Sequence, residues 1–208
     1  MINHIIRLVD VYDNIHRCLD TYHVWWYTGG NDKRKVRIIR REDKEMKEYY
    51  DAIIVGTGAA GLYCALNLPS RMKVLMITKQ QADQSDSFLA QGGICMLRGE
   101  EDYDNYFEDT MRAGHYENNK KAVDLMIRSS NSIIRDLIRH NVTFERDANG
   151  ELAFTREGAH SQPRILFYED VTGKQITQTL LSEAQTRDNI EICEYMTMVD
   201  LIAKDNIC

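Results

Sequence analysis

A glycine-rich turn between an apolar strand and an apolar helix constrains this sequence more than any other feature. Asp51 is followed by an apolar run at 52–55, rich in β-branched residues, that leads into Gly56-Thr57-Gly58-Ala59-Ala60-Gly61, a G-x-G-x-x-G pattern. In this pattern the first glycine permits a tight turn, the second lets a phosphate approach the backbone, and the third lets the helix pack on the strand. We therefore expect the free N–H groups at the start of the helix to face an anion.

The residues after the turn complete one βαβ unit. Residues 62–68 suit a helix, and residues 74–77 form a second apolar run. The pattern predicts an α/β fold with a Rossmann-like, nucleotide-binding unit, the alternative being a structural glycine turn without a ligand. NAD sites usually carry an acidic residue about 20 positions after the first glycine. Here the second strand ends in Thr78-Lys79, which disfavours NAD and leaves a flavin site open.

Length, charge and cysteine usage exclude several other classes. The chain has 208 residues, enough for one sizeable domain, and its net charge of -6 disfavours a nucleic-acid surface. Five cysteines form no C-x-x-C pair, so the sequence predicts neither a metal site nor a disulfide framework, and a reducing cytoplasm is the expected compartment. No apolar run could cross a bilayer, and charged residues interrupt the N-terminus where a signal peptide would be apolar.

Residues 1–48 differ in composition from the rest of the chain. They contain no alanine, serine, proline or glutamine, but they hold both tryptophans. Apolar residues over positions 2–19 fit one face of a helix, and a basic run follows at 33–41. Three interpretations stay open: an arm that binds a partner or a membrane surface, a solvated extension, or misread upstream sequence with the true start at Met46.

The middle of the chain offers two candidate ligand-binding segments. Ala90-Gln91-Gly92-Gly93 follows a polar loop and precedes a short apolar run at 94–97, which suggests backbone close to a ligand and then a strand, or else a plain turn. Residues 154–164 form a dense polar loop, which is either a site of chemistry or a solvated, salt-bridged loop.

Periodicity predicts the remaining elements. Helices are expected over 103–114, 120–140 and 174–186, the last capped by Thr172, with a turn at 147–150 and strands at 189–195 and 197–202. The buried face of the second of these helices is expected to hold Val123, Met126, Ile127, Ile133, Ile134, Leu137 and Ile138.

Four stretches in this order resemble the flavoprotein family that contains the L-aspartate oxidases and the flavoprotein subunits of succinate dehydrogenase and fumarate reductase. They are residues 54–62 (I-V-G-T-G-A-A-G-L), 87–94 (S-F-L-A-Q-G-G-I), 155–161 (T-R-E-G-A-H-S) and 170–174 (D-V-T-G-K). The first is shared by many FAD proteins, and the second narrows the resemblance to this family. The third is similar to the L-aspartate oxidase branch.

One position separates the branches of the family. The respiratory subunits attach FAD covalently through a histidine four residues before the alanine of A-Q-G-G, and this chain has Asp86 there. A carboxylate cannot form the histidyl–flavin bond. The resemblance therefore implies non-covalent FAD, as in the L-aspartate oxidases.

The resemblance also implies a reaction and a set of site residues. The reaction would be FAD-dependent oxidation of L-aspartate to iminoaspartate in de novo NAD synthesis, with O2 or fumarate as acceptor and quinolinate synthase as a possible downstream partner. Glu157 would pair with the substrate ammonium, Lys79 would lie near the adenosine, and Gly56 to Gly61 would hold the pyrophosphate. The residues expected to line the flavin are Asp86, Ser87, Phe88, Leu89, Ala90, Gln91, Gly92 and Gly93.

The sequence also departs from the family. Gln162-Pro163 stands where basic residues are common, and Phe167 where a histidine is common. Residues 49–208 correspond to the first part of the FAD-binding domain, without the capping and helical domains, so we expect a fragment that does not oxidise aspartate alone. The alternatives are a soluble fumarate reductase-like flavoprotein and a non-catalytic remnant that binds a nucleotide or a partner.

Overall fold

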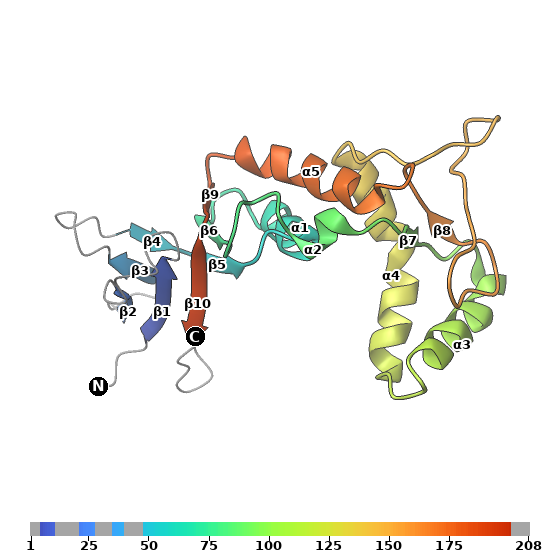
Figure 1. Cartoon of the computed structure of the whole chain (residues 1–208), viewed down its shortest axis with the longest axis horizontal. Helices are drawn as coiled ribbons and strands as arrows, with labels where there is room; N and C mark the ends of the chain where they lie inside the picture. The colour runs from blue at the N-terminus through green and yellow to red at the C-terminus, as the bar shows by residue number, and fades with distance from the viewer. Residues whose placement is uncertain (1–4, 11–20, 28–34, 40–47, 201–208) are drawn as a thin grey trace. The chain divides into compact units, whose positions relative to one another are not determined.

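The computed structural model describes residues 5–10, 21–27, 35–39 and 48–200, and the chain forms two compact units (Figure 1). The first unit comprises Met1–Ser85 and Leu181–Cys208, and the second comprises Asp86–Leu180. None of the helices in the described ranges has the length and hydropathy needed to cross a membrane.

A parallel sheet and one helix form the Rossmann-like part of the first unit. The strand order is β5 (Ala52–Val55), β6 (Val74–Ile77) and β9 (Ile190–Cys193), and α1 (Ala59–Asn67) connects the first two strands. All four residues of β6 are fully buried, because this central strand is paired on both sides and covered on both faces. The predicted βαβ unit and the α/β fold class are confirmed.

An antiparallel sheet forms the other part of this unit. Its order is β10 (Met196–Asp200), β1 (Ile5–Asp10), β2 (Thr21–Tyr27), β3 (Lys35–Ile39) and β4 (Glu48–Tyr50). The helix predicted over residues 2–19 is therefore wrong at 5–10, where three β-branched residues in six favour a strand that pairs on both sides. Met46, the proposed start, lies outside the described residues.

The second unit is built around a helical pair. Its elements are α2 (Asp86–Leu89), β7 (Ile94–Cys95), the 3-10 helix η1 (Glu100–Asp102), α3 (Tyr103–Ala113), α4 (Lys120–Arg139) and β8 (Ile165–Leu166). Helices α3 and α4 pack against each other, and their shared core holds Leu97, Tyr106, Met111, Val123 and Ile127. Helix α5 (Thr172–Gln185) begins in this unit and ends in the first.

Two local predictions concern a turn and a helix face. The turn at 147–150 is confirmed, with Gly150 at φ +83° and the Asp147 carboxylate accepting the N–H groups of Asn149 and Glu151. The placement of Met126 on the buried face of α4 is wrong, since this residue is 47% exposed. Its neighbour Ile127 occupies the buried position instead.

Thr172 is not the cap that the sequence suggested. It is the first residue of α5, and its hydroxyl accepts the N–H of Tyr168, which lies before the helix. The side chain therefore closes the preceding loop and leaves the N–H groups at the start of α5 uncapped by it.

Candidate functional site

The predicted cofactor-binding residues fall on both units of the chain. Residues 56–61 and Lys79 belong to the first unit, whereas residues 86–93 and Glu157 belong to the second. Within each unit, a different set of close backbone contacts holds the predicted cofactor-binding residues.

The glycine turn in the first unit brings strand and helix into direct backbone contact. Gly56 has φ +104°, a conformation that side chains disfavour, and its N–H donates to the carbonyl of Ile77 on the neighbouring strand at 2.8 Å. A Cβ on Gly61 would lie 2.2 Å from the carbonyl oxygen of Gly56, so only glycine fits there. These contacts agree with the roles predicted for the two glycines, which are to permit the tight turn at Gly56 and close packing of helix on strand at Gly61.

The start of α1 offers unused donors. Gly58 occupies the N-cap position without a side-chain cap, and the first turn carries no acidic residue. Thr57 is 2% exposed, and its hydroxyl finds no hydrogen-bond partner among the described residues. A buried hydroxyl without a partner is costly unless a ligand supplies one. The turn therefore fits the pyrophosphate of a dinucleotide such as FAD.

The end of β6 lacks an acidic group in the structure as in the sequence. Thr78 is buried and held between strands, because its N–H donates to Cys193 and its carbonyl accepts from Met196. Lys79 follows as an exposed side chain. This position can contact a ribose or an adenine only through a cation and backbone groups.

The A-Q-G-G segment in the second unit is fixed by two glycine contacts. The N–H of Gly173 donates to the carbonyl of Ala90 at 2.9 Å, and a Cβ on Gly173 would lie 2.0 Å from the carbonyl of Ser87. A Cβ on Gly93 would lie 2.1 Å from the carbonyl of Leu166 on β8. Two of the motif stretches, 87–94 and 170–174, therefore pack directly against each other.

Glu157 lies beside this segment. A Cβ on Gly92 would be 3.6 Å from the Glu157 Oε2 atom, which is ordinary van der Waals distance. Glu157, Asp86 and Leu89 are all exposed or partly exposed to solvent. The structure thus brings an exposed carboxylate to the predicted flavin-lining segment.

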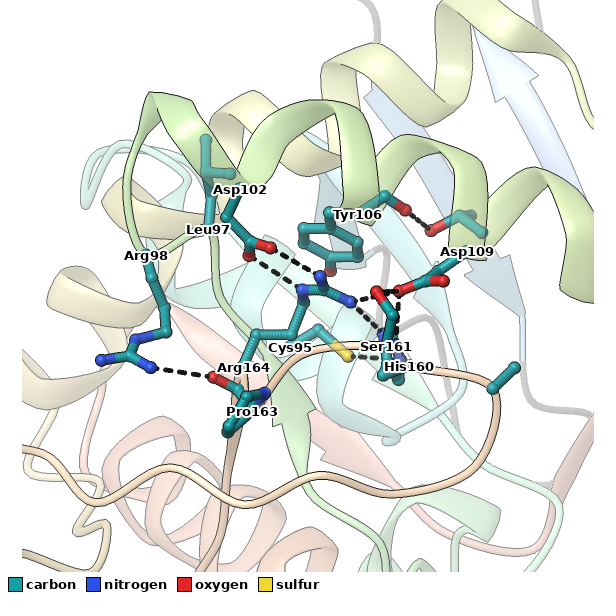
Figure 2. Close-up of polar contacts among 12 residues, drawn as sticks. Cys95, Leu97, Arg98, Asp102, Tyr106, Asp109, His160, Ser161, Pro163 and Arg164 are labelled. Atoms are coloured by element: carbon teal, nitrogen blue, oxygen red, sulfur yellow. Dashed lines mark hydrogen bonds and ion pairs between the residues drawn. The ribbon is translucent and has the colours of Figure 1, made fainter.

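A buried arginine, Arg164, stands behind the loop that carries Glu157. Its side chain is fully buried, and its guanidinium makes a bidentate pair with Asp102 through Nε and Nη2 at 2.9 and 2.6 Å (Figure 2). Nη1 donates to Asp109 Oδ2 at 2.7 Å and to His160 Nδ1 at 3.0 Å, and the ring of Tyr106 lies 4.9 Å away. The hydrogen bonds to Asp102 raise the pKa of Arg164, so its charge is permanent.

This arginine also determines the tautomer of His160. Because a guanidinium nitrogen can only donate, His160 Nδ1 must accept, and the ring proton sits on Nε2. Nε2 lies 3.2 Å from the Cys95 sulfur, which therefore accepts this N–H (Figure 2). Burial and the charge of Arg164 lower the pKa of His160, which agrees with a neutral ring. Burial raises the pKa of the Cys95 thiol, so it is not an activated nucleophile.

Helix α3 also holds this loop directly, through Asp109 and Arg112. The N–H and the hydroxyl of Ser161 both donate to Asp109 Oδ2 at 2.7 Å, and Arg112 bridges Asp109 Oδ1 to the carbonyl of Ala159. Burial would raise the pKa of Asp109, but the hydrogen bonds from Ser161 and Arg164 outweigh it and hold this pKa well below its ordinary value. The ion pair between Asp109 and Arg164 that anchors the loop is buried, whereas the Arg112 side chain is half exposed.

Sequence reasoning missed the acidic partners of this loop. Asp102, Tyr106 and Asp109 follow each other at intervals of four and three residues, which places them on one face of α3 and the residue directly before it. Two acids in a stripe that also holds a core tyrosine signal a buried cation. Nothing in the sequence shows that the cation is Arg164, more than fifty positions away.

Comparison with known proteins defines the class of this fold and site. A family model described as FAD binding domain matches residues 51–208, so the chain belongs to this family of FAD-binding proteins. The prediction of FAD as the cofactor is confirmed at that level.

Named relatives narrow the resemblance further. The chain is 44% identical over 163 residues to the L-aspartate oxidase of Clostridium perfringens, covering 78% of this chain and 37% of that protein. It is also 44% identical over 158 residues to the L-aspartate oxidase of Clostridium acetobutylicum, covering 76% of this chain and 36% of that protein. The predicted resemblance to L-aspartate oxidases is confirmed, and the chain spans little more than a third of these relatives' length.

Solved structures share the fold at lower identity. The FrdA chain of the E. coli quinol fumarate reductase matches with a TM-score of 0.70 at 24% identity, covering 75% of this chain and 27% of that chain. The Mycobacterium smegmatis Sdh1 complex matches with a TM-score of 0.68 at 24% identity, covering 75% and 29%. These likenesses establish the fold.

Proposed function

We propose that this chain forms the first part of the FAD site of an L-aspartate oxidase and orients the substrate through Glu157. The observation that carries the proposal is the Glu157 carboxylate beside Gly92 of the A-Q-G-G segment, in a chain 44% identical to two L-aspartate oxidases. A bound FAD would supply the redox chemistry of this reaction, as acceptor of the hydride from the substrate Cα, with O2 or fumarate as the final electron acceptor.

The chain's own residues hold the cofactor and the substrate by complementary charge. The N–H groups after Gly58 and the Thr57 hydroxyl would donate to the pyrophosphate, and Lys79 would lie at the adenosine end. Residues 86–93 would line the flavin, and Asp86 would leave it free of a covalent bond.

Glu157 accepts hydrogen bonds from the substrate ammonium, a group that succinate does not have. An exposed carboxylate next to the flavin-lining segment orients an amino acid by a charge-assisted hydrogen bond. The product would be iminoaspartate, quinolinate synthase would be the enzyme that consumes it, and the cytoplasm would be the compartment.

Addition of L-aspartate to the purified, FAD-supplied protein, followed by the flavin absorbance spectrum, tests this proposal as a binding measurement. We expect bound aspartate to shift the flavin spectrum without reducing the flavin, whereas succinate at the same concentration should not shift it. A spectral shift by succinate alone would favour the fumarate reductase branch. Failure to bind FAD would favour a non-catalytic remnant.

Glu157→Gln isolates the substrate contact. This substitution keeps size and hydrogen-bonding capacity but removes the charge, so we expect weaker aspartate binding by about tenfold or more with FAD binding unchanged. Full aspartate affinity in this variant would show that Glu157 has another role.

A further inference from the structure

The loop that carries Glu157 has a defined beginning and end. Thr155 and Ile165 exchange both backbone hydrogen bonds, at 2.9 and 3.1 Å, so residues 156–164 form a closed excursion from β8. Most of this excursion is exposed, including Glu157 and Gly158. Its conformation must therefore come from the few side chains that reach inward.

Arg164 joins those inward contacts. One guanidinium contacts Asp102 just before α3, Asp109 on α3 and His160 in the loop, and Asp109 in turn receives both donors of Ser161. Moving the loop away from α3 would leave buried charges unpaired, which is strongly unfavourable. The middle of the loop is thus fixed at two consecutive residues, His160 and Ser161.

The fixed residues lie close to Glu157. The N–H of His160 donates to the carbonyl of Glu157 at 3.2 Å, and Gly158 has φ +52°, so residues 157–160 form a tight turn. This turn ends at His160, whose imidazole ring is held by Arg164. The Glu157 carboxylate then lies against Gly92. The contacts therefore run from the buried guanidinium to the His160 ring, and from the His160 N–H to the backbone of Glu157, whose side chain carries the carboxylate.

We propose that Arg164 is a positioning residue for Glu157: through His160, Asp109 and Ser161 it fixes the turn that places the Glu157 carboxylate beside Gly92. The importance of this placement for substrate recognition rests on the proposed function of Glu157. Arg164 itself is fully buried and acts on Glu157 through this turn.

Arg164→Lys separates charge from geometry. A lysine keeps one positive charge near Asp102, but a single ammonium cannot donate in the fork geometry that serves two carboxylates and an imidazole. We therefore expect the variant to fold but to lack the hydrogen bond to His160 Nδ1. Arg128→Lys is the matched control, because Arg128 also pairs with an aspartate at 2.8 Å in the same unit but is half exposed and outside this loop.

Nuclear magnetic resonance of the full chain measures both the tautomer of His160, which contacts Arg164, and the distance between Glu157 and Gly92. In the unmodified chain, imidazole nitrogen shifts should show the proton of His160 on Nε2, and nuclear Overhauser effects should join Glu157 side-chain protons to Gly92. In Arg164→Lys we expect a mixed His160 tautomer, no Glu157–Gly92 effect and at least about tenfold faster exchange of the Ser161 amide, since a hydrogen bond to a charged group is worth that much. Arg128→Lys should change none of these signals.

An intact Glu157–Gly92 effect and a single His160 tautomer in Arg164→Lys would overturn the proposal. If that variant does not fold, Asp109→Asn tests the same linkage from α3, and there too an unchanged Glu157–Gly92 effect would overturn it. Failure of the proposed function has a different signature: Glu157→Gln would keep full aspartate affinity while the Glu157–Gly92 proximity still depended on Arg164.

Discussion

At the scale of single residues, two neighbouring glycines have opposite surroundings. A Cβ on Gly93 would meet the Leu166 carbonyl at 2.1 Å, whereas a Cβ on Gly92 would meet only the flexible end of Glu157 at 3.6 Å. Gly93→Ala should destabilise the chain by about 1–3 kcal/mol, because backbone must move to admit the methyl group. Gly92→Ala should leave stability nearly unchanged. Urea denaturation of the two variants checks this contrast, which equal losses of stability would contradict.

Asp109 and Asp124, which both pair with arginines at short range, should also differ in how much they stabilise the chain. Asp109 is 3% exposed and Asp124 is 44% exposed, although their ion pairs measure 2.7 and 2.8 Å. Asp109→Ala should cost about 3 kcal/mol or more, because it leaves a buried arginine short of a partner. Asp124→Ala should cost far less, since water solvates both of its groups. Chemical denaturation of both variants gives the comparison, and a larger destabilisation by Asp124→Ala would refute it.

Asp102, Asp109, His160 and Arg164 form a buried network of ion pairs and hydrogen bonds, and acid should weaken it in two stages. The pKa of His160 lies below its ordinary 6.5 and that of Asp109 below its ordinary 3.8, so the unfolded chain binds each proton more readily than the folded chain. The contribution of His160 is therefore complete above about pH 6.5 and declines as the pH falls below it, while that of Asp109 declines below about pH 4. Urea midpoints across pH should fall in both windows. His160→Gln should remove only the first decrease.

At the scale of secondary-structure elements, α4 depends on one side chain at its start. Asn119 Oδ1 accepts the N–H groups of Lys121 and Ala122 at 3.0 and 3.2 Å. Asn119→Ala should cost about 1 kcal/mol, because two donors lose their partner. Asn119→Ser, which preserves a capping oxygen, should retain most of the stability. Thermal unfolding of the pair measures the difference, and equal behaviour would mean that the cap contributes little.

Elements with strong periodicity could be predicted from the sequence, and elements that depend on partners could not. Helices α3 and α4 and the βαβ unit follow from apolar spacing and glycines. The sequence predicts a helix in place of strand β1 because a run of isoleucines fits either period, and only pairing with β2 and β10 decides. The ion pairs of Arg164 join positions that no local pattern relates, so the sequence indicates a site at Glu157 and residues 86–93 but not its buried support.

At the scale of the whole molecule, the flavin should be released from the protein by denaturation. Asp86 lies in the first turn of α2, where a carboxylate cannot form the histidyl–flavin bond. Acid precipitation of the FAD-loaded protein should therefore leave all flavin in the supernatant, as its absorbance will show. Flavin that stays with the precipitate would show a covalent bond at another residue.

The buried network has a consequence for how sequences of this kind can diverge. Substituting any one of Asp102, Asp109 or Arg164 leaves a buried charge without its full set of partners. Replacing all three together by apolar residues could preserve stability. These positions should therefore change as a group across lineages, or stay fixed. Gln162 and Pro163 are exposed and lie between the anchored residues, so each can be substituted independently of the network. The departure of the chain from the family pattern at these two positions therefore leaves the loop conformation unchanged.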